Sequence, residues 1–350
     1  MSVVGGLRNA SLVIESRLQN PFINAALGSY FARKVGTEFP NKILFLSSSH
    51  EGVLIGRNQN CWDECDMQKM KEDKVPLLRR ETGGGACYVD RGNRLFSFIE
   101  ATSNPQIKKY YPVVVRALNQ LDLKGQTATM QGSNDISIGS KKISGSACSF
   151  DGRAFRHHGT VLFNVDKTKL SKYLTPSKIK LESKGITSVK MRICNLVEIN
   201  SRLTQEQLDA ELIKSYESEI GGLKEVLVID KKNLEIVLRD HRVYEMIYKR
   251  LTSDEFRFNA NPIFSHRFEH KFSFGNLEVL ISCSDNKIVE CKIFSDSLDV
   301  FFIDQLQKVL LGKEYRMESI LPIMDELLEV MGEGYKKGIE EFCKVLSVRL

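Results

Sequence analysis

The sequence lacks the features that mark several large protein classes. None of its stretches approaches the roughly 20 consecutive apolar residues of a membrane-spanning helix. Its eight cysteines form no C-x-x-C pair, which argues against a zinc ribbon or a thioredoxin-like site, and they are too sparse for a disulfide scaffold. It contains no P-loop, no internal repeat and no dense run of lysine or arginine typical of a nucleic-acid binder. The N-terminus does not read as a secretory signal.

The composition is that of a soluble globular protein. Hydrophobic residues make up 42% and charged residues 27% of the 350 residues, so the chain can bury at least one sizeable core. This length suggests two domains. A net charge of +6 is mild, and it is compatible with an acidic ligand or partner without requiring one.

Helical and strand-like patterns alternate along the first 250 residues. Apolar residues recur at helical spacing after Asn20-Pro21, and Gly36 suits the end of that helix. Short apolar runs predict strands, and further helical spacing predicts helices. The predicted strands cover 43–46, 53–55, 77–78, 95–99 and a hairpin from 135 to 165 that turns at 139–140; the predicted helices cover 111–121, 205–220 and 243–251. This mixture predicts an α+β fold with a sheet of mixed direction.

The pattern of residues changes after a segment near 251–262, where the chain crosses from one predicted domain to the next. From Phe264 to Phe274, aromatic residues and histidines fall on alternate positions, which is strand spacing. Strands at 277–282 and 288–294 and helices at 306–311 and 320–331 follow. We therefore predict two domains, 1–252 and 253–350, the second a small α+β domain. The H-x-x-E-H pattern at 266–270 is no zinc site, because four residues along a strand span about 13 Å.

A glycine-rich loop is the sharpest motif in the chain. In the run Arg79-Arg80-Glu81-Thr82-Gly83-Gly84-Gly85-Ala86-Cys87-Tyr88, two arginines end a strand and meet three glycines. Consecutive glycines let backbone N–H groups approach an anion, and the arginines add forked donors for carboxylate or phosphate. On spacing alone, a plain glycine turn with solvated arginines remains open.

A pair of lysines on a strand is the second candidate. Lys141 and Lys142 precede the small residues Ile143-Ser144-Gly145-Ser146-Ala147. Adjacent residues on a strand face opposite sides, so we expect only one of these lysines to point into a site. An exposed hairpin pair is the simpler alternative.

Two further residue types carry less weight. The neighbours His157 and His158 diverge on a strand, so they make a poor metal site, and a histidine satisfied by the core is the simpler expectation. Cys148 follows Lys142 by six positions, and a small buried cysteine is expected there rather than a nucleophile.

Together these motifs resemble the lipoate–protein ligase family. Arg80–Tyr88 is similar to the family's adenylate-binding loop, and 142–147 is similar to its lysine motif. Residues 55–60, 157–160 and 184–189 resemble further signatures in the family's order, and 264–266 and 294–298 resemble its accessory domain. Val89 departs from the pattern, because many members have histidine there.

The resemblance implies a fold, an activity and a site. The fold is a catalytic domain of the biotin/lipoate ligase type with a small accessory domain. The activity converts (R)-lipoate and ATP, with Mg²⁺, to lipoyl-AMP, and then acylates a lysine of a lipoyl domain. The implied residues are Arg80, Gly83, Gly84, Gly85, Ala86, Cys87, Tyr88, Asn134, Asp135 and Lys142 for ATP and lipoyl-AMP; Arg80, Gly84, Lys142, His158 and Gly159 for lipoate; Lys142 for catalysis; and Asp135 for Mg²⁺.

The resemblance also leaves alternatives. The nearest is a lipoyl or octanoyl transferase that uses a pre-activated donor and has no adenylation step of its own. A non-catalytic lipoate- or nucleotide-binding module is a different class, and biotin ligation fits the loop less well. The implied partners are lipoyl domains of 2-oxoacid dehydrogenase acyltransferases and the glycine-cleavage H protein, with no nucleic acid and no membrane. We expect an intracellular monomer, mitochondrial if eukaryotic and cytoplasmic if bacterial.

Overall fold

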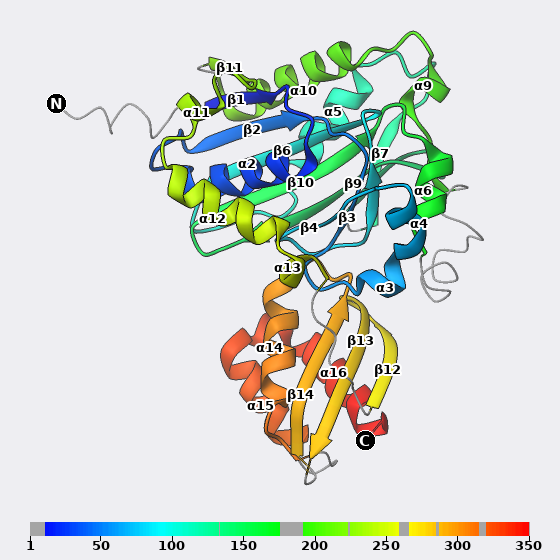
Figure 1. Ribbon diagram of the computed structural model, residues 1–350, viewed down its shortest axis with the longest axis vertical. Coiled ribbons are helices and arrows are strands. Elements are labelled where there is room, and N and C mark those ends of the chain that lie inside the picture. Colours follow the sequence, from blue (N-terminus) through cyan, green and yellow to red (C-terminus); the bar gives the residue numbers. More distant parts are fainter. Residues whose placement is uncertain are drawn as a thin grey trace, which may run out of the picture.

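The larger part of the chain is organised around one sheet. The computed structural model describes residues 11–132, 134–175, 192–222, 225–258, 266–284, 287–314 and 320–349. The eight-stranded sheet has the order β11-β1-β2-β6-β10-β9-β8-β7 (Figure 1). Its strands are β1 (Ser11–Ser16), β2 (Lys42–Ser47), β6 (Asn93–Ala101), β7 (Ala128–Gln131), β8 (Asp135–Ile138), β9 (Lys141–Phe150), β10 (Ala154–Leu162) and β11 (Glu225–Ile229).

The sheet has mixed direction, as predicted. Strand β1 runs parallel to both of its neighbours, β11 and β2, whereas the remaining neighbours pair antiparallel. The Gly139-Ser140 turn joins β8 and β9, and Gly139 adopts φ +58°, which explains the glycine there. The α+β prediction is therefore confirmed.

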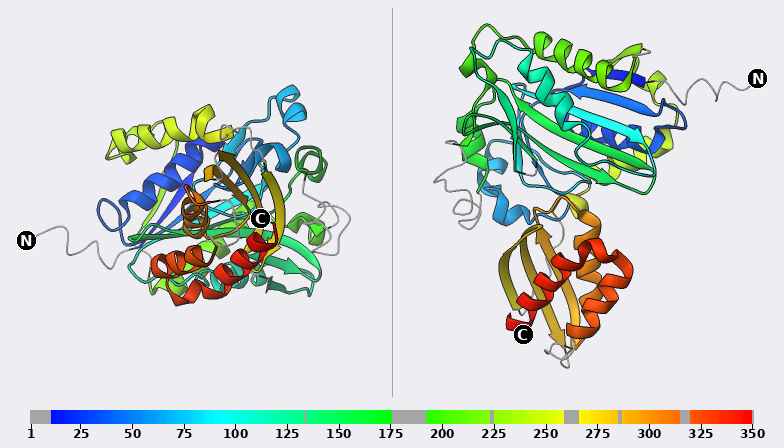
Figure 2. Two further views of the ribbon diagram at one scale, coloured as in Figure 1. Left: turned by 90° about the horizontal axis from the view of Figure 1, so that it is seen from below. Right: turned by 180° about the vertical axis from the view of Figure 1, so that it is seen from behind.

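Helices cover both faces of this sheet (Figures 1 and 2). Helices α5 (Tyr111–Asn119) and α10 (Gln205–Ile220) pack on one face, with Phe98, Val113 and Tyr216 in the core between them. Helices α2 (Pro21–Lys34) and α12 (His241–Thr252) pack on the other face. The predicted helix after Asn20 is α2. It begins there because the Asn20 side chain accepts hydrogen bonds from the backbone N–H groups of Phe22 and Ile23.

A second, three-stranded sheet carries the glycine-rich loop. It consists of β3 (Gly52–Ile55), β4 (Leu77–Arg79) and β5 (Cys87–Val89), with β3 in the middle. The short helices α3 (Cys61–Glu64), α4 (Met67–Glu72) and α6 (Lys167–Tyr173) lie near it, and Tyr88, Met70 and Tyr173 share its core. Three other short helices are α9 (Leu196–Ile199), α11 (Leu234–Val237) and α13 (Asp254–Phe258).

The described residues between 266 and 349 form one sheet and three main helices, set apart from the larger sheet, and we call them the C-terminal unit (Figure 2). Its elements are β12 (His266–Phe272), β13 (Gly275–Ser284), β14 (Lys287–Ser295), α14 (Val300–Leu310), α15 (Ile320–Met331), the short 3₁₀ helix η2 (Glu333–Tyr335) and α16 (Lys336–Arg349). The alternating aromatic segment is β12, in which Phe272 is buried while Arg267 and Lys271 are exposed. The strand geometry supports the rejection of a zinc site there.

Helix α13 packs on α12 and β4 and so belongs with the larger part of the chain. The predicted boundary after residue 252 remains a prediction, since residues 259–265 lie outside the described residues. Within the described ranges, no helix is both long and apolar enough to cross a membrane.

Candidate active site

The glycine-rich loop connects β4 to β5 and folds over the centre of the larger sheet. Gly84 has φ +91°, a conformation that side chains disfavour. A Cβ built on Gly84 would lie 3.4 Å from the Cβ of Ala147 on β9, so the loop rests on that strand. A Cβ on Gly56 would come within 2.1 Å of the Gly84 carbonyl oxygen. A Cβ on Gly85 would meet nothing within 4 Å, so the loop is open on that side.

Arg80 ties this loop together. Its guanidinium donates to the carbonyl oxygens of Gly83 at 2.7 Å and Gly85 at 2.8 Å. Its Nη2 would also lie 2.9 Å from a Cβ on Gly84, so the positive charge stands directly under the loop. Arg80 is therefore held among loop carbonyls, at the place where the sequence predicted an anion.

Arg79 does not join the site, and that part of the prediction was wrong. Its side chain is 1% exposed, and its Nη1 donates to the carbonyls of Arg57 and Gln59. Its Nε donates to the carbonyl of Phe256 on α13 at 2.8 Å. Neighbouring residues at the end of a strand point to opposite sides, so Arg79 fastens α13 to β4 while Arg80 faces the loop.

Lys142 is the inward lysine of the pair. Lys141 is exposed, whereas Lys142 is partly buried and its Nζ lies 2.7 Å from Oδ1 of Asp135. A β-bulge shifts the pairing of β8 with β9 so that Ser137 opposes Lys142 and Ile136 opposes Ser144. Burial lowers the pKa of the Lys142 ammonium to about 8, and the charge of Arg80 acts in the same direction. Lys142 and Arg80 are thus electrostatic neighbours.

Asp135 is already occupied by two cations. It is 6% exposed, its Oδ1 bonds to Lys142, and its Oδ2 bonds to the guanidinium of Arg192. Among the described residues, no group of three histidine, cysteine or acidic side chains could hold a metal ion. Asp135 in this arrangement does not fit a Mg²⁺ ligand, and its metal role stays a prediction. Asn134 lies beside it and donates to the Ser146 carbonyl at 3.0 Å.

The two histidines diverge as expected. His158 faces the loop, with Nε2 2.7 Å from Oγ1 of Thr82, and burial followed by the charge of Arg156 lowers its pKa. His157 is fully buried on the opposite face, its ring centroid 4.4 Å from that of Tyr111. Gly159 is required where it stands, because a Cβ there would lie 2.6 Å from the Gly145 carbonyl oxygen. Cys148 is buried, and burial raises its pKa to about 12, so it has the inert character that we expected.

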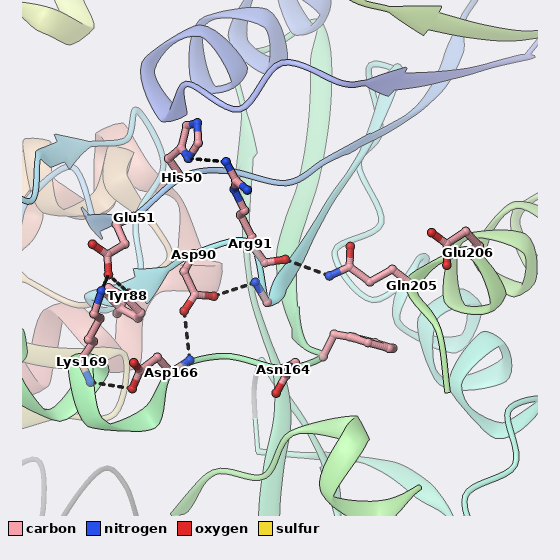
Figure 3. A pocket seen from close by; sticks show the side chains of 12 residues that line it. His50, Glu51, Tyr88, Asp90, Arg91, Asn164, Asp166, Lys169, Gln205 and Glu206 are labelled. Atoms are coloured by element: carbon pink, nitrogen blue, oxygen red, sulfur yellow. Dashed lines mark hydrogen bonds and ion pairs between the residues drawn. The ribbon is translucent and has the colours of Figure 1, made fainter. Parts of the chain in front are cut away.

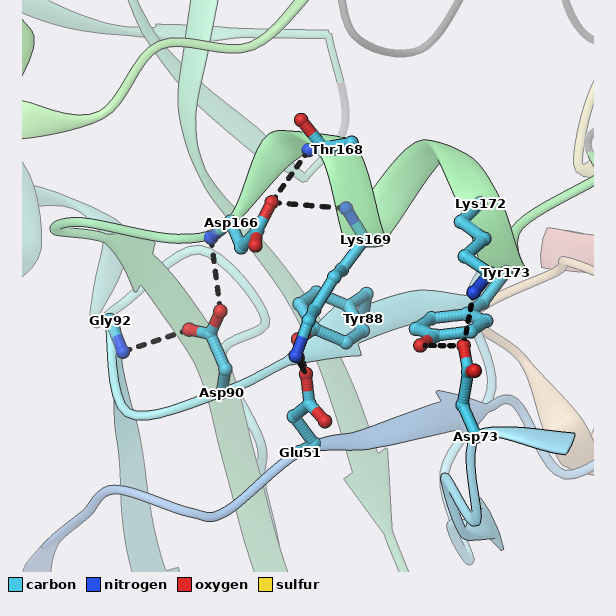
Figure 4. A network of polar contacts seen from close by, with 10 residues as sticks. All are labelled: Glu51, Asp73, Tyr88, Asp90, Gly92, Asp166, Thr168, Lys169, Lys172 and Tyr173. Carbon is cyan, nitrogen blue, oxygen red and sulfur yellow. Dashed lines mark hydrogen bonds and ion pairs between the residues drawn. The ribbon is translucent and has the colours of Figure 1, made fainter. Parts of the chain in front are cut away.

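Tyr88 and Cys87 differ in their access to the site. Cys87 is partly exposed beside Arg80 and Lys142. Tyr88 turns to the other side of β5, where its hydroxyl donates to Glu51 at 2.8 Å. Figure 4 shows this polar network, in which Glu51 also bonds to Lys169 of α6 and Asp90 bonds to the N–H groups of Gly92 and Asp166. The Tyr88 side chain therefore fixes β5 instead of facing the loop.

A cavity of about 650 Å³ lies on this far side of β5 (Figure 3). Its walls carry charges of both signs, with Arg91 bonded to His50 and, through its carbonyl, to Gln205. Of the predicted site residues, Tyr88 alone lines it. Arg80, Gly85 and Lys142 do not line this cavity.

The C-terminal unit touches the glycine-rich loop. The Gly84 N–H donates to the Ser297 carbonyl at 3.0 Å, and a Cβ on Gly83 would lie 2.2 Å from the same oxygen. Arg57 and Asp304 form an ion pair across the same boundary at 3.1 Å. The sequence did not predict this contact, because hydrogen bonds between carbonyl and N–H groups leave no residue signature. The resembling signature at 184–189 lies outside the described residues.

Two family descriptions match separate parts of the chain. "Lipoyl protein ligase A/B catalytic domain" matches residues 20–217, and "Bacterial lipoate protein ligase C-terminus" matches residues 261–346. The chain is 34% identical to lipoate-protein ligase A of Psychrobacter cryohalolentis, covering 90% of this chain and 92% of the relative. It is 33% identical to lipoate-protein ligase A of Bdellovibrio bacteriovorus, covering 94% and 96%.

Solved structures agree in fold. P. falciparum LipL1 in complex with lipoate has a TM-score of 0.83 at 31% identity, covering 97% of this chain and 100% of that one. A bi-partite lipoate protein ligase of Thermoplasma acidophilum, described with its E2 lipoyl domain, has a TM-score of 0.59 at 23% identity, covering 74% and 100%. A lipoate-protein ligase A bound with ATP has a TM-score of 0.57 at 22% identity, covering 72% and 98%.

Proposed function

Because the chain belongs to the lipoate–protein ligase family, we propose that it activates (R)-lipoate with ATP and then attaches the lipoyl group to a lysine of an acceptor protein. Its function as a lipoate–protein ligase follows from relatives of that name, which it matches over nearly their whole length. The same relatives favour a ligase over the alternative transferase that would use a pre-activated donor.

One observation carries the assignment of the reaction to this site. Arg80 belongs to the glycine-rich loop and Lys142 to β9, so two segments distant in the sequence meet where the loop rests on Ala147. A Cβ on Gly145 would lie 2.5 Å from Nζ of Lys142. Two cations beside a glycine-rich backbone segment are suited to holding a carboxylate against a phosphate.

In the proposed first step, a carboxylate oxygen of lipoate attacks the α-phosphorus of ATP. A new P–O bond forms, the bond to the β-phosphate breaks, and pyrophosphate leaves. The Lys142 ammonium and the Arg80 guanidinium stabilise the negative charge that gathers on the phosphoryl oxygens. Holding two anions in contact is the main difficulty of this step, so positioning by the loop supplies much of the rate.

In the proposed second step, the amine of an acceptor lysine attacks the carbonyl carbon of lipoyl-AMP. The C–N bond forms, the C–O bond to AMP breaks, and the amine loses a proton. Lys142 again stabilises the oxygen that gains negative charge. We propose that the acceptors are lipoyl domains, namely those of 2-oxoacid dehydrogenase acyltransferases and the glycine-cleavage H protein. The description of the Thermoplasma acidophilum ligase with its E2 lipoyl domain supports this class of partner.

The requirement for Mg²⁺ is part of the proposal. Mg²⁺ commonly binds through substrate phosphates and one or two carboxylates, where it neutralises phosphate charge. Since both oxygens of Asp135 bond to cations, we assign no step to a metal held by this residue. We further propose an intracellular monomer, mitochondrial if eukaryotic and cytoplasmic if bacterial, consistent with eight free thiols.

The decisive experiment is mass spectrometry of a lipoyl domain incubated with the chain, ATP and lipoate. We expect one lipoyl group on one lysine, and no product when ATP is left out. Exchange of pyrophosphate into ATP, dependent on lipoate, separates the ligase from the transferase. A modified acceptor obtained only from supplied lipoyl-AMP, without exchange, would contradict the proposed first step.

A further inference from the structure

A row of partly exposed side chains runs along the middle of the larger sheet. On β10, Arg156, His158 and Thr160 are partly exposed while the residues between them are buried. This strand lies between β6 and β9 and is not an edge strand. Partial exposure at alternate positions places these three side chains on one face of the sheet, the face that also carries the glycine-rich loop.

The residues opposite this row on β9 are small. Gly145 pairs with Thr160, Ala147 with His158, and Ser149 with Arg156. Lys142 stands at the Gly145 end, because its Nζ lies beside Gly145. From Gly145 to Ser149 the strand advances about 13 Å. Lys142 and Arg156 therefore lie at opposite ends of this strip, whose length is that of an extended medium-chain acyl group.

Arg156 is a cation without a carboxylate partner among the described residues. Its Nε donates to the Ser97 hydroxyl at 3.0 Å, and its Nη1 lies 3.4 Å from the Ser29 hydroxyl. Glu81, an acidic residue that also acts electrostatically on Arg156, forms ion pairs with Arg33 and Arg250 instead. Neither hydroxyl neutralises its charge, so this partly exposed guanidinium is available to a further acceptor.

The helix above Arg156 is shaped to admit it. Gly28 lies in the interior of α2, where glycine is unfavourable relative to alanine. A Cβ on Gly28 would lie 2.4 Å from Nη2 of Arg156. The glycine therefore makes room for the guanidinium at the end of the strip.

We propose that Arg156 sets the acyl preference of the site. Its guanidinium binds the dithiolane end of lipoate, whose sulfurs are the acceptors, and it disfavours the methyl end of a plain fatty acid. This inference rests on the proposed function. With the carboxylate at Lys142, the far end of the chain reaches Arg156. Disulfide sulfurs are weak hydrogen-bond acceptors that can replace some of the water around a guanidinium, whereas a methyl group removes that water without replacement.

The test compares lipoate with octanoate in pyrophosphate exchange by the full chain. For Arg156→Met we expect the ratio of the KM for octanoate to the KM for lipoate to fall by about tenfold or more. The change should fall on KM instead of kcat, and Arg156→Lys should restore part of the lipoate preference. Arg153→Met is the matched control, since Arg153 is an exposed arginine on the same hairpin, and it should leave the ratio unchanged.

Gly28→Ala provides a second test if Arg156→Met does not fold. Its Cβ displaces the guanidinium, so the KM ratio should shift in the same direction. An unchanged ratio in a folded variant would overturn the inference about Arg156 while leaving the ligase function intact. If the unmodified chain showed no exchange, the proposed function would fail, and calorimetric binding of the two acids would still test Arg156 by the ratio of their affinities.

Discussion

The backbone N–H of Gly84 donates a hydrogen bond to the carbonyl of Ser297 at 3.0 Å, so a donor of the glycine-rich loop is satisfied by the C-terminal unit. A phosphate that bound this N–H would compete with the Ser297 carbonyl. The Arg57–Asp304 pair alongside is partly exposed on both sides, and such pairs contribute at most about 1 kcal/mol. The Arg57–Asp304 pair therefore adds little to the cost of exchanging the Gly84–Ser297 hydrogen bond for a ligand.

Alanine substitutions should distinguish the roles of Lys141 and Lys142 on β9. Lys142→Ala should lose about 10²- to 10³-fold in both half-reactions, because an oxyanion contact in a dry site is worth about 3–4 kcal/mol. Lys141→Ala should stay within a few-fold of the parent, since Lys141 is exposed. Single-turnover kinetics with lipoate and with supplied lipoyl-AMP measure each step. An inactive Lys141→Ala beside an active Lys142→Ala would reverse the assignment.

Neighbouring glycines of the loop should respond differently to alanine. Gly84→Ala forces a side chain into φ +91° and towards Arg80, which should destabilise the protein by about 1–3 kcal/mol and weaken binding of lipoyl-AMP. Gly84→Val should weaken binding further. Gly85→Ala meets nothing within 4 Å and should leave the unfolding temperature unchanged. Thermal unfolding and calorimetry of lipoyl-AMP binding measure both effects, and equal unfolding temperatures for the two alanine variants would refute the strain at Gly84.

The stability of a chain truncated before the C-terminal unit should depend on whether α13 is kept. A chain that ends after Phe258 retains the carbonyls that accept from Arg79, whereas one that ends at Thr252 leaves Nε of this buried arginine without them. We expect the shorter chain to be less stable by about 1–3 kcal/mol. Both should lose most adenylation, as the family resemblance implies for the accessory domain. Denaturant unfolding compares their stabilities, and full pyrophosphate exchange by the longer fragment would contradict the second expectation.

His157 should make the protein sensitive to acid. It is fully buried, its ring nitrogens have no hydrogen-bond partner among the described residues, and burial lowers its pKa to about 3 from 6.5. The unfolded chain binds a proton more readily, so stability is complete above pH 6.5 and is lost as the pH falls towards 3. Between pH 6.5 and 5 the loss should be about 1–2 kcal/mol. His157→Phe, which places a third ring beside Phe96 and Phe98, should remove this loss in the free energy of unfolding measured with urea. Parallel pH profiles of the parent and the variant would contradict the prediction.

Local patterns predicted most of the fold. The alternation from Phe264 to Phe274 identified β12, and the spacing after Asn20 identified α2. Both signals come from residues close together in the sequence: the two-residue period of a strand for β12, and a capping side chain for α2. The sequence pattern does not predict the helix at 336–349, and α13 falls within the segment 251–262 that the pattern indicates as the crossing point between domains.

The site was only partly predictable. Glycines and lysines that lie close in sequence pointed to the loop and to Lys142. The orientation of Arg79, the second cation on Asp135 and the place of Arg156 depend on contacts between distant segments, such as α2 with β10. The β-bulge that sets the register at Lys142 leaves no signal in residue type.

The parallel pairing of β1 with β11 has a consequence for synthesis on the ribosome. Leu12 pairs with Glu225, so one edge of β1 stays unpaired until β11 has been synthesised. At roughly 5–20 residues per second, this wait lasts roughly 10–40 s. Hairpins such as β8–β9 close in microseconds. The nascent chain therefore carries an unpaired strand edge long after most of its sheet can form, which makes this the interval in which it most needs protection from aggregation.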